Sequence, residues 1–399
     1  MKIAVVYLAD YPPSKGASGG DRRVRDIARG IAAQGHEVYM AVPRRDETRV
    51  SREVDGLHVT YLGKPGGGPL GQLINRLSFW SGLQKFAVRE KIDWILLYNV
   101  DFDAFFVGRW LRRKGIRLAA EFCDMYSAAI KRTSLAGLAG WSRARLNEML
   151  VPKATALNIV ISRFLKAYTE KRAPKTPCLL LPVLVDSELF RSNENAVVKA
   201  EERWGIKESD VLFAYVGGLW KQEGVGSLIE AFADIIRRFP RARLIVAGRL
   251  VKASTHDDIE DLIEKYELYD SVVTPGWVST EDVVTIYSRA DVLVLPQIND
   301  RCTVAALPTK SAEYALMGKA IIATKVGDIP IYFHDDDDAL LVESENVSAL
   351  AMAMERLIED PTLRHRLATG AHKVAEAHFD YRQAGRRIVE AMKETIIRD

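Results

Sequence analysis

Short apolar runs alternate with amphipathic segments along most of this chain. In the first half, the runs that predict strands are KIAVVYLA (2–9), HEVYMAVP (36–43), LHVTYL (57–62), DWILLYNV (93–100), RLAAEFCD (117–124) and ALNIVIS (156–162). Between them, apolar residues recur at helical spacing, which predicts helices at 20–34, 72–90, 103–114, 141–150 and 163–172. Several of the strands are apolar throughout, as is typical of a parallel sheet that helices cover on both faces.

The second half repeats the same alternation. Its predicted strands are VLFAYVG (211–217), ARLIVAG (242–248), SVVTPGWV (271–278), DVLVLP (291–296) and KAIIATKV (319–326), with helices near 224–239, 258–267, 280–290 and 309–318. After residue 346 the pattern is almost wholly helical. We therefore predict two doubly wound α/β domains, with the boundary in the polar stretch near 186–200.

Length and composition agree with two domains. The chain has 399 residues, of which 48% are hydrophobic and 27% charged, as in a globular protein. The N-terminus lacks the features of a signal peptide, and no apolar run has the length of a membrane-spanning helix. The three cysteines form no even-numbered framework, so we expect reduced thiols and a cytoplasmic location.

Charge is distributed unevenly along the chain. Residues 1–190 contain 30 Lys and Arg against 18 Asp and Glu, a net charge of +12, whereas residues 191–399 contain 26 against 35, a net charge of −9. A basic first half favours an anionic partner, which could be a membrane surface, a phosphorylated acceptor or nucleic acid. The alternative is a chance distribution of solvated surface charge.

The segment YVGGLWKQEGVGSLIEAF (215–232) is the first candidate for binding chemistry. A predicted strand runs into Gly217 and Gly218, and a helix begins shortly afterwards. Free backbone N–H groups and the helix dipole at such a turn favour an anion such as phosphate. Glu223, however, has the wrong charge for a phosphate site. The segment is therefore either a phosphate site with an unusual residue or the remnant of one.

Two other segments have related features. In 18–38, Gly19 and Gly20 precede a helix and would let a ligand approach the backbone, although an ordinary strand-to-helix turn explains them equally well. In 308–323, Lys310 and Glu313 share one face of a first helical turn. A lysine there opposes the helix dipole unless it binds an anion, and a glutamate can accept two ribose hydroxyls. A surface ion pair is the alternative.

Together with several further motifs, these segments resemble glycosyltransferase family 4, whose members are retaining enzymes that use nucleotide sugars. The similarity extends over nearly the whole chain. The other segments that show this similarity are GHEV (35–38), PVLVDSELF (182–190), LIVAG (244–248), PGWVSTEDVVTIYSRADVLVLP (275–296), PTKSAEYALMGKAIIAT (308–324) and VGDIPIYFHDDDDALLV (326–342).

The resemblance implies a GT-B fold, in which two Rossmann-like domains face each other across a cleft. Residues 1–190 would bind the acceptor, 191–375 would bind the donor, and 376–399 would form a helix that packs back on the first domain. The donor would be a UDP- or GDP-sugar, with no permanently bound cofactor and no metal. The product would belong to bacterial surface polysaccharide or glycolipid synthesis.

The resemblance also implies roles for particular residues. Glu313 would hold the donor ribose, Lys310 and Gly20 would lie near the diphosphate, and Trp277 would pack on the base unless it is a core aromatic. The donor-binding set is Gly19, Gly20, Gly217, Gly218, Lys221, Arg249, Trp277, Val278, Thr309, Lys310 and Glu313, and the catalytic candidates are Asp124 and Lys310.

This sequence departs from the family pattern at several positions. The family's diphosphate-binding Arg and Lys fall on Gly218 and Glu223, an earlier Glu falls on Ala305, and the His of a His-Asp pair falls on Cys123. Cys123 is then a structural thiol, and Asp124 either contacts the sugar or acceptor or caps a strand end.

Loss of both family cations leaves two phosphate charges without partners. Lys221, Arg249 and Lys310 are the candidate replacements, although Arg249 could also be an ordinary surface residue. If none of them reaches the phosphates, the chain is a non-catalytic binding or partner subunit with the same fold. A nucleotide-sugar 2-epimerase is disfavoured by the linker and donor-helix motifs, and a dehydrogenase by the absence of a dinucleotide fingerprint.

Segment 70–91 carries Leu, Ile, Phe and Trp along one face, with Arg and Lys at the flanks. That pattern suits a helix that rests on an anionic membrane, and it also suits a helix packed in the core. With the basic first half, it makes a lipid-linked acceptor and a peripheral location at the inner face of the membrane an expectation. No binding of nucleic acid is expected.

Overall fold

The computed structural model describes the chain except for residues 14–17, 47, 50, 67, 100–102, 131, 192–193, 249–258 and 399, and except for the side chains of 69–70, 194–196 and 398. It divides into two compact units: unit 1 comprises Met1–Leu184 and Tyr381–Asp399, and unit 2 comprises Val185–Asp380. The boundaries expected at 190 and 375 differ from this division by a few residues. Phe190 stacks on Tyr287 within unit 2 at 6.3 Å between ring centroids, and a helix of unit 2 continues to His378.

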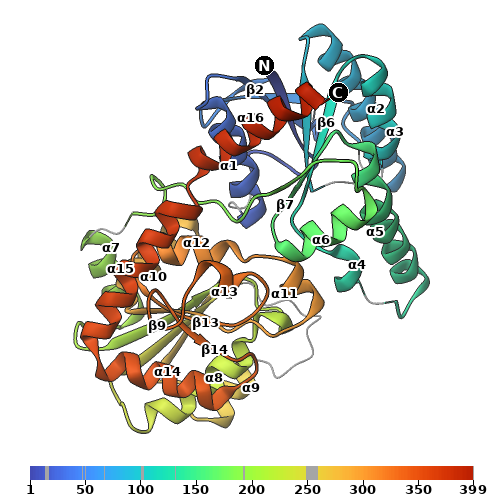
Figure 1. Cartoon of the computed structure of the whole chain (residues 1–399). Helices are drawn as coiled ribbons and strands as arrows, with labels where there is room; N and C mark the ends of the chain where they lie inside the picture. The colour runs from blue at the N-terminus through green and yellow to red at the C-terminus, as the bar shows by residue number, and fades with distance from the viewer. Residues whose placement is uncertain are drawn as a thin grey trace. The chain divides into compact units, whose positions relative to one another are not determined.

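Unit 1 is built on an eight-stranded sheet (Figure 1). In spatial order its strands are β3 (Arg52–Val54), β4 (Leu57–Leu62), β2 (Glu37–Pro43), β1 (Lys2–Tyr7), β5 (Trp94–Tyr98), β6 (Arg117–Phe122), β7 (Leu157–Val160) and β8 (Cys178–Leu180). Each neighbouring pair is parallel except β3 and β4. The carboxyl ends of the parallel strands therefore lie at one edge of the sheet.

Helices from both ends of the chain cover this sheet. They are α1 (Gly19–Ala32), α2 (Gly68–Arg89), α3 (Asp103–Arg113), α4 (Tyr126–Ala129), α5 (Leu135–Ala154), α6 (Arg163–Arg172) and α16 (Tyr381–Arg398). The last helix of the chain, α16, packs along α1 of the same unit. The approach is close, because a Cβ atom on Gly385 would lie 2.0 Å from the carbonyl carbon of Gly30.

Unit 2 is built on a six-stranded sheet in which every pair is parallel. Its order is β11 (Val272–Gly276), β10 (Ala242–Ala247), β9 (Val211–Val216), β12 (Val292–Leu295), β13 (Ala320–Thr324) and β14 (Leu340–Val342). Its helices are α7 (Glu194–Trp204), the 3-10 turn η1 (Lys221–Glu223), α8 (Val225–Ile236), α9 (Ile259–Lys265), α10 (Thr280–Arg289), α11 (Arg301–Ala305), α12 (Thr309–Leu316), α13 (Ile329–Tyr332), α14 (Val347–Glu359) and α15 (Pro361–His378). The strand order reverses between β9 and β12.

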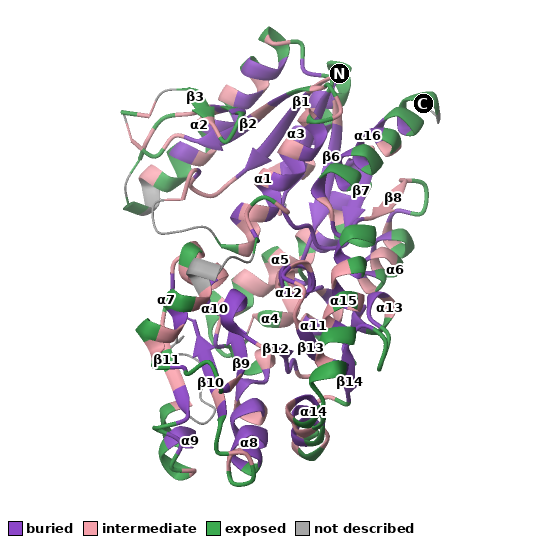
Figure 2. Cartoon of the chain, turned by 90° about the vertical axis from the view of Figure 1, so that its left-hand side faces the viewer, coloured by how far each residue is buried: buried purple, intermediate pink, exposed green. Residues whose placement is uncertain are grey.

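Burial follows the predicted pattern. The strands of both sheets are largely buried and the outward faces of the helices are exposed (Figure 2). The five residues of β5 and the six of β1 are almost entirely apolar because helices cover both faces of the sheet. The prediction of two parallel-sheet α/β domains is confirmed. Among the described residues, no helix is both long and apolar enough to cross a bilayer.

Candidate functional site

In unit 2, the loops after β9 and β12 meet at the carboxyl edge of the sheet, where the strand order reverses. Gly224 has φ +70°, and a Cβ atom on it would lie 1.8 Å from the carbonyl oxygen of Pro296, so only glycine fits there. The backbone N–H of Ile298 donates to the carbonyl of Gln222 at 3.0 Å. In open α/β sheets, ligands bind at this kind of switch point.

A cation and a carboxylate are paired at this edge. Lys310 Nζ, from the first turn of α12, lies 2.9 Å from Glu223 Oε2, at the end of η1, and 3.2 Å from the hydroxyl of Tyr215 on β9. The Tyr215 hydroxyl is itself 2.9 Å from Glu223 Oε2. The side chains of Lys310 and Glu223 are only 12% and 15% exposed. The predicted cation is thus present at the predicted phosphate loop, and it is bound to a carboxylate.

The surroundings hold this pair in place. Burial raises the pKa of the Tyr215 hydroxyl well above its usual value, and the nearby Glu223 carboxylate raises it further. Tyr215 therefore remains a protonated donor. Its hydroxyl also lies 2.8 Å from the carbonyl oxygen of Gly218. A Cβ atom on Gly217 would lie 2.6 Å from Lys310 Nζ, so this glycine leaves the space that the ammonium uses.

Helix α12 supplies three of the predicted donor residues, Thr309, Lys310 and Glu313. Pro308 is its N-cap residue and makes no side-chain capping bond, and Thr309 and Lys310 begin the first turn. Glu313 is buried one turn later, where its Oε2 accepts a hydrogen bond from the Tyr287 hydroxyl at 3.2 Å. The ion pair that Lys310 makes runs to the loop after β9, so the alternative of an ordinary surface pair does not hold.

The remaining predicted donor residues differ in exposure and in the elements that carry them. Trp277 is 60% exposed, which excludes the alternative of a core aromatic, and Val278 beside it is buried. Both follow the edge strand β11, two strands away from β9. Lys221 is exposed at the start of η1. Arg249 lies outside the described residues.

In unit 1, the glycine pair begins α1, but the helix end is already capped. Ser18 and Asp21 form a reciprocal capping box, and the Tyr7 hydroxyl donates to Asp21 Oδ1 at 2.7 Å. A Cβ atom on Gly20 would lie 3.2 Å from the Tyr98 hydroxyl, so packing explains this glycine. Gly19 is the first residue of the helix. These contacts give the Gly19–Gly20 turn a structural role independent of any ligand.

Asp124 follows β6 at the carboxyl edge of the unit 1 sheet, with its side chain exposed. The Tyr126 hydroxyl donates to Asp124 Oδ2 at 3.3 Å, and the side-chain amide of Asn99 donates to the Tyr126 hydroxyl. Asn99 directly follows β5 with φ +56°, a conformation that asparagine tolerates better than most residues. Sequence reasoning missed Asn99 and Tyr126, although a polar residue directly after a buried strand was the available signal.

Two of the departures from the family pattern are buried apolar positions. The side chain of Cys123 is 6% exposed, and burial raises the pKa of its thiol well above the usual value, in agreement with a structural role. Ala305 is fully buried in α11.

A buried ion pair lies beneath the edge that carries Asp124. Arg23 Nη2 of α1 is 2.6 Å from Glu121 Oε1 of β6, and the two side chains are 2% and 0% exposed. Arg23 also donates to the carbonyls of Leu181 and Pro182, at 3.1 and 2.7 Å. The pair therefore joins α1, the sheet and the segment that leaves unit 1.

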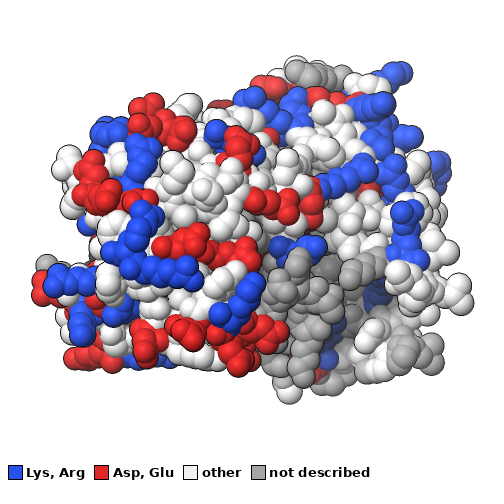
Figure 3. All heavy atoms as spheres, turned by 90° about the horizontal axis from the view of Figure 1, so that it is seen from below, with Lys and Arg blue, Asp and Glu red and all other residues white. Residues whose placement is uncertain are grey.

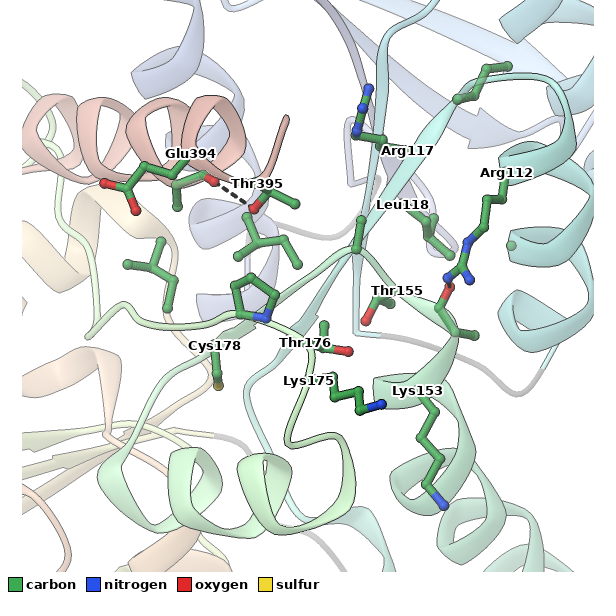
Figure 4. Close-up of a pocket in the computed structure, with 18 of the residues that line it drawn as sticks. Arg112, Arg117, Leu118, Lys153, Thr155, Lys175, Thr176, Cys178, Glu394 and Thr395 are labelled. Carbon is green, nitrogen blue, oxygen red and sulfur yellow. Dashed lines mark hydrogen bonds between the residues drawn. The ribbon is translucent and has the colours of Figure 1, made fainter. Parts of the chain in front are cut away.

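A cavity of about 1070 Å³ in unit 1 lies elsewhere, at the amino ends of β6 to β8 (Figure 4). Arg112, Lys153 and Lys175 line it, together with Thr155, Thr176 and residues of α16. Arg112 and Lys153 belong to the last turns of α3 and α5, where cations interact favourably with the negative ends of the helix dipoles, and Arg112 donates to the Ala154 carbonyl at 3.2 Å. These two cations thus have a structural explanation, and the cavity is at the opposite edge from Asp124.

Metal ligation has no visible basis in the part of the chain that the structure describes. Within those residues, no group of three or more His, Cys, Asp or Glu side chains is arranged to hold an ion.

Comparison with known families matches both halves of the chain. Residues 18–183 match the model of the glycosyl transferase 4-like domain, and residues 198–374 match that of glycosyl transferases group 1. A D-inositol 3-phosphate glycosyltransferase of Corynebacterium glutamicum is 25% identical over 389 residues, which cover 93% of this chain and 91% of that protein.

Solved structures agree over the full length. Sucrose-phosphate synthase from Thermosynechococcus elongatus aligns with a TM-score of 0.79 at 20% identity and covers 100% of both chains. The Anabaena protein Alr3699/HepE, in complex with UDP and glucose, aligns with a TM-score of 0.72 at 18% identity, over 99% of this chain and 100% of that one. At identities of 20% and 18%, the similarity to these two structures shows a shared fold and nothing further.

Proposed function

This chain belongs to the glycosyltransferases of the family 4 type, which have the GT-B fold, and on that premise we propose that it transfers a sugar from a nucleoside diphosphate sugar, with retention of configuration. The proposed donor is a UDP- or GDP-sugar bound by unit 2. The UDP complex of the Anabaena relative supports UDP as the first nucleotide to examine.

One observation carries the donor proposal. Lys310 and the glycine loop after β9 lie together at the switch point of the unit 2 sheet, which is where a diphosphate would meet backbone N–H groups and a cation. The ammonium of Lys310 would offset the negative charge that develops on the departing diphosphate. Thr309 begins the same helix, and its backbone N–H is one of the free donors of the first turn.

Other residues would orient the two substrates. Glu313 would accept the ribose hydroxyls, and Trp277 and Val278 would flank the base. Asp124 would hold an acceptor or sugar hydroxyl in unit 1, where Tyr126 fixes one of its carboxylate oxygens. Catalysis would then come from positioning and from stabilisation of the diphosphate, without a covalent intermediate on the protein.

Titration calorimetry tests the donor site. We expect UDP or GDP to bind and ADP to bind more weakly, and we expect Glu313→Ala to weaken binding of the preferred nucleotide about 10-fold, because charge-assisted hydrogen bonds are lost. The 2′,3′-dideoxy form of that nucleotide, which lacks the ribose hydroxyls, should bind both proteins alike. Glu281→Ala, at an exposed carboxylate of unit 2, is the matched control. If UDP, GDP and ADP all fail to bind, the donor proposal is wrong.

For the acceptor, we propose a glycan or lipid-linked substrate of bacterial surface polysaccharide or glycolipid synthesis, reached at the inner face of the membrane. In α2 the aromatic part of the predicted stripe, Phe79 and Trp80, is buried, but Leu73, Ile74 and Leu77 are 52%, 46% and 63% exposed. Helix α2 has no acidic residue. In Figure 3, acidic and basic side chains alternate over one half of the visible face, and basic ones predominate over the other. Exposed apolar side chains on a basic helix favour an anionic bilayer.

Flotation with liposomes tests this acceptor proposal. We expect the protein to float with vesicles that contain anionic lipid at low salt, and to remain unbound with neutral vesicles or at high salt, because the attraction is partly electrostatic. Leu77→Glu should reduce the floating fraction severalfold. Val198→Glu replaces an apolar residue of unit 2 that is 51% exposed and should leave flotation unchanged. Failure of the unmodified protein to float at low salt would contradict the membrane location.

A further inference from the structure

Glu223 neutralises the cation that the proposed donor site offers. Lys310 contributes one positive charge to the cluster, Glu223 contributes one negative charge, and the protonated Tyr215 contributes none. An incoming diphosphate brings about two negative charges. It therefore meets an ammonium that is already paired, and the Glu223 carboxylate, at 2.9 Å from that ammonium, repels the incoming phosphate oxygens.

The backbone around Glu223 is fixed, and its carboxylate contacts the cluster through one oxygen. The N–H of Glu223 donates to the Trp220 carbonyl at 3.0 Å, and the next residue, Gly224, is held against Pro296. Two contacts of the carboxylate, to Lys310 Nζ and to the Tyr215 hydroxyl, run through the single oxygen Oε2. A change of side-chain rotamer would therefore release Lys310 without moving the loop.

We propose that Glu223 is an internal competitor for the diphosphate of the donor: it holds Lys310 when no donor is bound and must leave it before phosphate oxygens can take its place. The inference rests on the donor site proposed above. It makes Glu223 a determinant of nucleotide affinity, and it gives the departing nucleoside diphosphate a replacement partner for Lys310. Re-formation of the pair would accelerate release of the nucleotide after transfer.

The test compares nucleotide binding by the unmodified protein, Glu223→Gln and Glu264→Gln, with calorimetry for the affinity and stopped-flow displacement for the dissociation rate. Glutamine keeps the size of the side chain and its hydrogen bonds but removes the charge. We expect Glu223→Gln to bind UDP or GDP about 10-fold more tightly or better, and mainly through slower dissociation. Glu264 is exposed on α9, and its substitution removes the same charge from unit 2 at a remote position, so it should change affinity less than twofold.

A double variant separates competition from a general loss of negative charge. In the Lys310→Ala background, Glu223→Gln should give less than about a threefold gain, because the group for which it competes is absent. Thermal unfolding without ligand checks the fold, and the rise in Tm on addition of nucleotide should be larger for Glu223→Gln than for the unmodified protein.

The outcomes separate the two proposals. If the unmodified protein binds a nucleotide and Glu223→Gln binds it equally or more weakly, the competitor inference is overturned and the donor proposal stands. If neither protein binds any nucleotide, both are overturned. If only Glu223→Gln binds a nucleotide, both the donor proposal and the competitor inference are supported, and Glu223 weakens nucleotide affinity by more than the expected 10-fold.

Discussion

Lys310→Ala is expected to reduce the affinity for a nucleoside diphosphate by roughly 10- to 150-fold, because it removes the charge-assisted bonds to phosphate, which contribute about 1.5–3 kcal/mol. Lys310 is the predicted cation that the structure places against the Gly217 turn, at the switch point of the unit 2 sheet. The same substitution should reduce kcat, since the departing diphosphate carries more charge in the transition state than in the bound donor. Calorimetry with UDP and GDP, and turnover once a sugar donor is found, provide the two measurements.

Lys221→Ala is the matched control, because Lys221 is a cation of the same loop but is exposed. It should weaken binding by less than about threefold, as expected of a screened surface charge. A larger loss for Lys221→Ala than for Lys310→Ala would show that the phosphate contact belongs to Lys221, and our assignment of Lys310 would then be wrong.

Arg23→Met is expected to lower the free energy of unfolding of unit 1 by about 3–5 kcal/mol, since it leaves the Glu121 carboxylate buried without its partner. Glu121 is fully buried, and its other oxygen, Oε2, has no hydrogen-bond partner among the described residues. Methionine preserves much of the volume of arginine, so the loss reports the charge together with the hydrogen bonds to Leu181 and Pro182. Chemical denaturation measures it, analysed as two transitions because the chain has two units.

Two further measurements identify the cause of that loss. Arg23→Met combined with Glu121→Met should recover most of the stability, because an apolar pair of similar size often replaces a buried ion pair without cost. Burial raises the pKa of the Glu121 carboxyl, more than its pairing with Arg23 lowers it. A carboxyl with a raised pKa in the folded state contributes most stability at low pH and loses it as pH rises. The deficit of Arg23→Met should therefore be smallest in acid and grow toward neutral pH. A loss below 1 kcal/mol at pH 7 would contradict the role of the pair.

The sequence was sufficient for the fold because the strands are apolar on both faces, and such runs predict a covered parallel sheet even in isolation. Helix starts and ends were harder to predict. The polar composition of residues 186–200 predicts a domain boundary, yet α7 begins within that stretch, at Glu194. Helix α5 begins at Leu135, whereas the sequence predicts a start near 141. The predicted start is too late because the first turns contain Gly137 and Gly140, which lower helix propensity and conceal the helical pattern.

The site was predictable in its parts but not in its pairings. The sequence predicts Lys310 as a cation suited to a phosphate and Glu223 as an anion unsuited to one. That they bind each other depends on a contact between residues 87 positions apart, which the parallel sheet creates. Arg23 and Glu121, 98 positions apart, were not found, because a charged residue within an amphipathic segment ordinarily indicates an exposed face.

The return of α16 to unit 1 affects the order in which the two units can be completed. Unit 1 begins the chain, but the helix that packs along α1 starts at Tyr381, after all of unit 2. During translation, the face of α1 that packs against α16 therefore stays exposed to solvent until the ribosome has synthesised the whole of unit 2. Domains fold largely as they emerge, so unit 2 is the first to possess all of its parts. The unit that is synthesised first is the last one that can finish folding.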